Sequence, residues 1–149
     1  MKEIEIHSLE ETKALGLRLA KVIKPGMLFT LNGDLGAGKT TFTKALGEGI
    51  GIKKTINSPT FTILKIYQGR MPLYHIDAYR LEGIQQDLGF DDYFEDDGLC
   101  VIEWANYIEN QLPKERLEIT IRVMNENEDS RRFTFVPFGK KYEAVVEAL

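Results

Sequence analysis

The chain has 149 residues, of which 43% are hydrophobic and 28% charged, and its formal net charge is −4. This length suits one domain with a genuine core, and the composition is typical of a folded globular protein. No apolar stretch approaches the ~20 residues that span a bilayer, and no basic segment followed by an apolar run opens the chain, so we expect a cytoplasmic protein without a membrane segment. An acidic chain without a Lys/Arg-rich stripe is not expected to bind DNA, or RNA strongly, by itself.

Metal-binding and redox residues are scarce. The single cysteine, Cys100, excludes an internal disulfide, and a buried strand position is its expected role. The two histidines show no metal-like spacing, which argues against a transition-metal centre. Magnesium remains possible because it is held by hydroxyl, carboxylate and phosphate oxygens.

The first third of the chain alternates strands and helices. A strand is expected over residues 3–7, and Ser8 with Glu11 forms the capping-box pattern that opens a helix. The apolar run 27–31 is short enough for a strand buried on both faces, and a glycine-rich loop and a helix with Phe42 and Leu46 on one face follow it directly.

The rest of the chain adds hairpins and one more buried strand. The expected elements are a hairpin of 61–67 and 73–77, short helices within 82–98, a buried strand 99–102, a hairpin of 117–123 and 132–136, and a helix 140–149. This mixture predicts one domain, residues 1–149, with a three-layer α/β P-loop NTPase fold and a central, mostly parallel sheet with antiparallel additions. The pattern leaves the strand order open.

The glycine-rich loop carries the clearest chemistry. Residues 33–40 match G-x-x-x-x-G-K-[ST] at every fixed position, which predicts an ATP and Mg²⁺ site. Backbone N–H groups of such a loop and the positive end of the following helix bind phosphate oxygens. We expect Lys39 to contact the β- and γ-phosphates and Thr40 to bind Mg²⁺. The Thr41 hydroxyl either reaches the α-phosphate or lies on the helix surface. The remaining expected nucleotide contacts come from the loop backbone: Asp34, Leu35, Gly36, Ala37 and Gly38.

A second magnesium ligand is expected at the end of a neighbouring apolar strand. Glu103 follows the apolar residues 99–102, so it is the candidate, binding the ion directly or through a water. The alternative is an ordinary charged residue at a strand end. Trp104 beside it is interpreted as a packing residue.

Two further segments offer residues for chemistry or sensing. Strand alternation places His75, Asp77 and Tyr79 on one face, where Asp77 would orient or deprotonate an attacking water. Arg80 would neutralise developing phosphate charge. Thr60 stands about twenty residues after the loop, where nucleotide switches keep a hydroxyl that senses the γ-phosphate. The alternative for residues 75–80 is a solvated sheet edge, and the alternative for Thr60 is a plain turn. Spacing alone does not decide between function and structure for either segment.

The combined motifs resemble those of the bacterial TsaE family, the small ATPases of tRNA threonylcarbamoyladenosine biosynthesis. The resemblance is carried by the loop 33–41 together with Ser58-Pro59-Thr60-Phe61, His75-Ile76-Asp77-Ala78-Tyr79-Arg80 and Ile102-Glu103-Trp104. It covers roughly residues 8–104 and is weaker beyond them.

The resemblance implies an ATPase, weak alone and stimulated by partners, that works with the TsaD and TsaB proteins on adenosine 37 of tRNA without transferring the carbamoyl group itself. It implies tRNA contact through those partners, Mg²⁺ ligation by Thr40 and Glu103, a catalytic or switching role for Asp77, and a nucleotide contact from Thr12. An arginine of the last hairpin is also expected near the nucleotide. We assign Arg132, with its neighbour Arg131 as the alternative.

Two other functions use a similar loop. A small-molecule or nucleoside kinase would normally carry an arginine-rich lid, and no such lid is visible. A GTP-dependent switch would carry an Asn-Lys-x-Asp segment, which the chain lacks. The stretch 88–94 mixes aromatic and acidic residues, which fits either a docking loop or a helix packed by Phe90 and Phe94.

Overall fold

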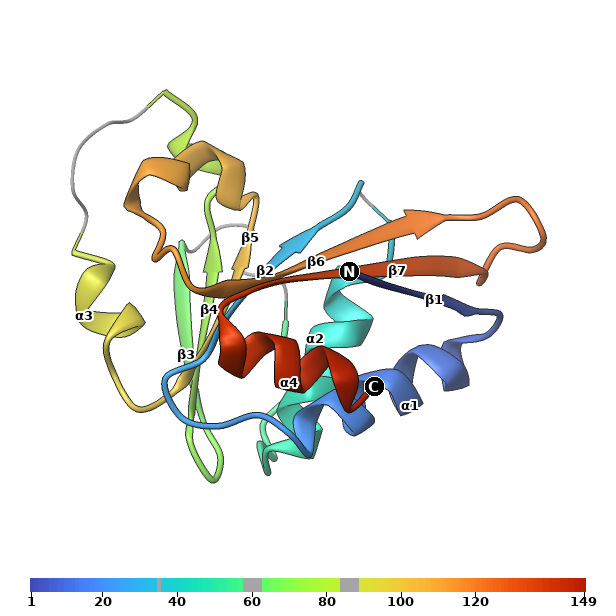
Figure 1. The fold of residues 1–149 in the computed structure, drawn as a ribbon, viewed down its shortest axis with the longest axis horizontal. Coiled ribbons are helices and arrows are strands. Elements are labelled where there is room, and N and C mark those ends of the chain that lie inside the picture. Colours follow the sequence, from blue (N-terminus) through green and yellow to red (C-terminus); the bar gives the residue numbers. More distant parts are fainter. Residues whose placement is uncertain (35, 58–62, 84–88) are drawn as a thin grey trace.

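The computed structural model describes residues 1–34, 36–57, 63–83 and 89–149, and its centre is one seven-stranded sheet (Figure 1). The strand order is β1-β7-β6-β2-β5-β4-β3. The strands are β1 (Lys2–Ile6), β2 (Leu28–Asn32), β3 (Leu64–Gln68), β4 (Pro72–Asp77), β5 (Leu99–Glu103), β6 (Arg116–Val123) and β7 (Arg131–Phe138). Each lies within a few residues of its predicted range.

The middle of the sheet is parallel and both sides are antiparallel. β2 pairs in parallel with β5 and β6, and β5 pairs in parallel with β4. β3, β7 and β1 pair antiparallel with their neighbours. The predicted parallel centre with antiparallel additions is therefore confirmed, but the sheet as a whole is mixed and not mostly parallel. Since parallel strands end at one edge, Leu31, Glu103 and Asp77 lie side by side across β2, β5 and β4.

One face of the sheet is covered by three helices that enclose the larger core (Figure 1). These are α1 (Leu9–Ala20), α2 (Lys39–Gly49) and α4 (Lys140–Glu147). The predicted N-cap opens α1, because the Ser8 hydroxyl accepts a hydrogen bond from the Glu11 backbone N–H at 3.1 Å. The Glu11 carboxylate accepts from the His7 N–H, one residue before the N–H that a capping box uses. Phe42 and Leu46 of α2 are fully buried against the strands, as their spacing predicts.

The other face carries a thinner layer of short helices. These are η1 (Tyr79–Leu81), α3 (Asp91–Phe94) and η2 (Ala105–Gln111), and they enclose a second core cluster with β2, β4 and β5. Phe90 and Phe94 are buried in it, so their packing interpretation is confirmed. β6 alternates buried and partly exposed residues, so the described part of this third layer leaves one face of β6 partly exposed. None of the helices in the described ranges is long and apolar enough to cross a membrane.

Candidate functional site at the carboxyl edge of the parallel strands

The loop of residues 33–38, which we call the glycine loop, connects β2 to α2. Gly36 and Gly38 have φ values of 80° and 103°, a left-handed conformation that disfavours side chains, and Gly38 is the N-cap of α2. Ala37 between them is buried, and Asp34 is exposed. Thr40 and Thr41 lie in the first turn of α2. Leu35 lies outside the described residues.

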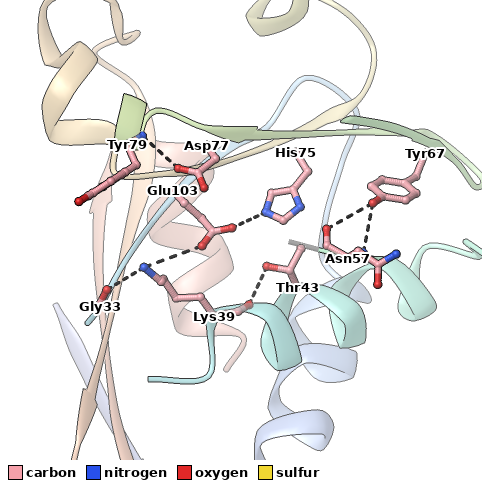
Figure 2. A network of polar contacts seen from close by, with 9 residues as sticks. All are labelled: Gly33, Lys39, Thr43, Asn57, Tyr67, His75, Asp77, Tyr79 and Glu103. Atoms are coloured by element: carbon pink, nitrogen blue, oxygen red, sulfur yellow. Dashed lines mark hydrogen bonds and ion pairs between the residues drawn. The ribbon is translucent and has the colours of Figure 1, made fainter. Parts of the chain in front are cut away.

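Lys39 and Glu103 form the centre of a buried polar chain (Figure 2). The Lys39 Nζ donates to the Gly33 carbonyl oxygen at 2.8 Å and lies 3.8 Å from Glu103 Oε1. Glu103 Oε2 lies 2.6 Å from His75 Nε2. Lys39 is 8% exposed and Glu103 4%, so each charge is compensated mainly by its neighbours in this chain. Glu103, predicted only from a strand end, therefore lies directly behind the glycine loop.

Asp77 stands next to Glu103 in the strand register. Its Oδ1 accepts a hydrogen bond from the Tyr79 backbone N–H at 3.0 Å (Figure 2). Burial raises the pKa of the Asp77 carboxyl above its usual value and the Glu103 charge adds to this, whereas the Tyr79 N–H, Lys39 and His75 lower it. The structure thus places two carboxylates and one ammonium at the carboxyl edge of β4 and β5.

Trp104 packs against the second core cluster, as interpreted from the sequence, and its ring is also part of this site. The Lys39 ammonium lies over its ring, 4.6 Å from the ring centre, a distance at which a cation is attracted to the aromatic face. The ring also contacts Tyr79 edge-on and stacks on Tyr107. Trp104 has a φ of 57°, which is uncommon for a bulky residue. The adjacency of Trp104 to Glu103 was the one sequence signal for this position.

Of the two neighbouring arginines, Arg131 lies at the glycine loop and Arg132 does not. Arg131 donates from Nε to the Ala37 carbonyl oxygen at 2.8 Å and from Nη2 to the Gly36 carbonyl oxygen at 3.4 Å. The next residue along a strand points to the opposite face, so Arg132 meets β1, where it pairs with Glu5 at 3.0 Å and Glu3 at 3.9 Å. We therefore replace Arg132 with Arg131 as the arginine of the site.

Thr12 lies on α1, which packs closely on α2. A Cβ added at Gly16 would lie 2.6 Å from Ala45 Cβ, and one added at Gly49 would lie 2.3 Å from Ala20 Cβ. Positions 16 and 20 of α1 therefore face 45 and 49 of α2 at close range. Thr12 lies one turn before Gly16 and is buried.

The structure locates one of the two remaining predicted residues. Arg80 is exposed on η1, and Thr60 lies outside the described residues. A cavity of about 190 Å³ opens beside Lys39 and Trp104. Its other polar lining residues are Asn32, Asp34, Asn106, Thr120 and Arg122. It continues the site toward β6.

The oxygen-donor set at this edge fits magnesium better than a transition metal. In the described part of the chain, no group of three or more His, Cys, Asp or Glu side chains is placed to hold a metal ion. Magnesium does not need such a group, because it is commonly bound through one or two protein oxygens plus nucleotide phosphates. The hydroxyl of Thr40 and the carboxylates of Glu103 and Asp77 are oxygen donors of that kind.

Comparisons with known proteins agree on one family. The family model described as "Threonylcarbamoyl adenosine biosynthesis protein TsaE" matches residues 6–133. The tRNA threonylcarbamoyladenosine biosynthesis protein TsaE of Bacillus subtilis is 51% identical, with 100% of this chain and 95% of that protein aligned. The protein of the same name from Treponema pallidum is 40% identical over 78% of this chain and 88% of its own length.

The fold comparison leads to the same conclusion. The crystal structure of Bacillus subtilis YdiB superposes with a TM-score of 0.84 at 44% sequence identity, covering 98% of this chain and 91% of that one. The family model spans both the glycine loop and Glu103, and it includes Arg131. The chain belongs to the TsaE family.

Proposed function

We propose that this chain binds and hydrolyses ATP with Mg²⁺ and acts in the threonylcarbamoyladenosine modification of tRNA. The observation that carries the ATP part is the position of Lys39. Its ammonium lies at the start of α2, next to the glycine loop, and is held by Gly33 and Glu103. A helix N-terminus with a nearby lysine is a site for phosphate anions, and the P-loop NTPase fold that we infer uses this arrangement.

Each residue has a role that follows from its chemistry. The backbone N–H groups of residues 34–38 would surround the phosphates. The Lys39 ammonium would leave Glu103 and contact the β- and γ-phosphates instead. Thr40 and Glu103 would hold Mg²⁺, which neutralises phosphate charge when bound. Thr12 and Thr41 would contact the nucleotide where α1 meets α2.

Asp77 is the candidate for the proton-handling group. It is half-buried, it stands one strand away from Glu103, and its raised pKa makes it a better proton acceptor than an exposed carboxylate. It would orient or deprotonate the attacking water. Arg80 and Thr60 are retained as proposed charge-neutralising and γ-phosphate-sensing residues.

The tRNA-modification part is supported by family membership. The curated relatives carry "tRNA threonylcarbamoyladenosine biosynthesis protein TsaE" as their name, and the chain aligns with the first over its whole length. We propose that it works with the TsaD and TsaB proteins and does not itself transfer the carbamoyl group. Its net charge of −4 is consistent with tRNA contact through those partners.

Phosphate release from ATP, measured with the purified chain alone and with TsaD and TsaB added, tests the proposal. We expect slow release that requires Mg²⁺ and rises with the partners. Lys39→Ala should abolish it, whereas the matched control Lys44→Ala should not, because Lys44 is an exposed lysine of the same helix. Transfer of the γ-phosphate to a nucleoside without free phosphate, or a clear preference for GTP, would contradict the proposal.

A further inference from the structure

His75 is a fully buried polar residue to which the proposed function gives no role. It lies on β4 between Lys65 of β3 and Val101 of β5 in the strand register. Its side chain is 0% exposed, and it points toward Glu103 on the face of the sheet that α2 covers (Figure 2). Ile76, the next residue, points to the opposite face and belongs to the second core cluster.

The two histidine nitrogens have very different surroundings. Nε2 lies 2.6 Å from Glu103 Oε2, and because a carboxylate oxygen can only accept, Nε2 carries the proton and donates it. Nδ1 is buried and has no hydrogen-bond partner within the described ranges. A buried nitrogen without a partner costs stability, so an apolar side chain would serve a purely structural role better.

The contact restricts Glu103 in a specific way. The terminal torsion of a glutamate is broad, so an unrestrained carboxylate samples many orientations. With Oε2 engaged by His75, the rotation of the carboxylate is restricted, and Oε1 is the oxygen directed toward Lys39. Residues that hydrogen-bond to metal ligands orient them in this manner in other metal sites.

We infer that His75 is a positioning residue that holds Glu103 with Oε1 directed at the glycine loop, so that this oxygen is preorganised to bind Mg²⁺ when ATP is present. The inference rests on the proposed function, because it takes Glu103 as a magnesium ligand. It assigns to His75 an effect on the metal only, transmitted through Glu103, and no contact with the nucleotide.

Two amide substitutions separate positioning from packing. The amide nitrogen of His75→Gln can occupy the place of Nε2 and still donate to Glu103, whereas the shorter side chain of His75→Asn cannot reach it. The measurement is the dissociation constant of a fluorescent ATP analogue, once in excess Mg²⁺ and once in EDTA. The ratio of the two constants reports how strongly the metal favours binding, independently of hydrolysis.

We expect His75→Asn to lower this ratio about 10- to 100-fold, the usual effect of removing a residue that orients a metal ligand, with little change in EDTA. His75→Gln should keep a ratio close to that of the wild type. Thermal melting checks the fold of each variant, and His75→Leu replaces the asparagine variant if that one does not melt cooperatively.

A wild-type ratio in His75→Asn would overturn the inference, and so would equal losses in the asparagine and glutamine variants. Equal weakening in Mg²⁺ and in EDTA would also overturn it, because a distorted site affects both constants. Failure of the proposed function gives a different result, since the wild-type chain would then bind no analogue under either condition.

Discussion

Arg131 and Arg132 are adjacent in the sequence but are predicted to differ sharply in their effect on nucleotide binding. Arg131 holds the backbone of the glycine loop through the carbonyl oxygens of Ala37 and Gly36. It is itself fixed by the carbonyl oxygens of Glu128 and Ser130, which accept from Nη1. We expect Arg131→Ala to weaken ATP binding, because the loop loses the contact that keeps its N–H groups in place.

The magnitude follows from the number and kind of contacts. A hydrogen bond from a charged group contributes about 1.5–3 kcal/mol, and the 2.8 Å bond from Nε to Ala37 is the one short contact of this kind between Arg131 and the described part of the glycine loop. Since about 1.4 kcal/mol corresponds to a factor of ten, ATP affinity should fall about 10- to 100-fold. Arg132 pairs with Glu3 and Glu5 through half-exposed side chains, and such surface pairs contribute about 0–1 kcal/mol of stability.

The assay is a titration of each alanine variant with ATP by calorimetry in the presence of Mg²⁺. Arg132→Ala is the matched control, because it removes the same charge one residue away. Its affinity for ATP should equal that of the wild type, with at most a small drop in melting temperature. If Arg132→Ala lost more affinity than Arg131→Ala, or if Arg131→Ala bound ATP as the wild type does, the placement of Arg131 at the site would be refuted.

Three other predictions concern Lys39, Trp104 and Cys100. Lys39→Ala should lower phosphate release by about 100-fold or more, because it removes a preorganised cation from the developing phosphate charge; near-normal release would reject the site. Trp104 is the only tryptophan in the sequence, so binding of ATP with Mg²⁺ should change the intrinsic tryptophan fluorescence as Lys39 leaves the ring. An unchanged fluorescence spectrum in the wild type, or an equal change in Lys39→Ala, would contradict this. Burial raises the pKa of the Cys100 thiol to about 12, so a thiol reagent at pH 8 should titrate one group in denaturant and none in the folded protein; rapid reaction of the folded chain would show that Cys100 is accessible. The raised pKa also makes the free energy of unfolding depend on pH: the contribution of the protonated Cys100 thiol is present below pH 9 and is lost as the pH rises toward 12. Chemical denaturation at a series of pH values should therefore show a smaller loss of stability in Cys100→Ala than in the wild type.

The local elements were readable from the sequence because short-range chemistry determines them. The Ser8 N-cap, the apolar runs and the glycine loop each depend on neighbours within a few residues, and the structure has them at the expected places. The strand order was not readable, because it depends on which strands pair across long chain separations. The thinness of the third layer was not readable either; in the described part of the chain, residues 78–98 and 104–112 form only short helices there.

The site residues likewise differ in whether local sequence or strand pairing places them. Lys39 and Glu103 were found because a motif and a strand end mark them. Arg131 and Arg132 could not be distinguished, since only the pairing of β7 with β1 fixes which one turns toward the loop. The packing of Trp104 is confirmed, but its contact with Lys39 could not be predicted because the two residues meet only once β2 and β5 are aligned.

Under the proposed function, the arrangement of charges also predicts that ATP and Mg²⁺ bind cooperatively. In this structure Lys39 compensates the buried Glu103 carboxylate at 3.8 Å. Phosphate oxygens that draw Lys39 away would leave Glu103 beside Asp77 with His75 as its remaining hydrogen-bond partner among the described residues. Removing one partner of a buried ion pair costs about 3–5 kcal/mol, so ATP alone should bind weakly. A divalent cation that takes the place of Lys39 at Glu103 removes that cost, and the ratio of affinities with and without Mg²⁺ measures it directly.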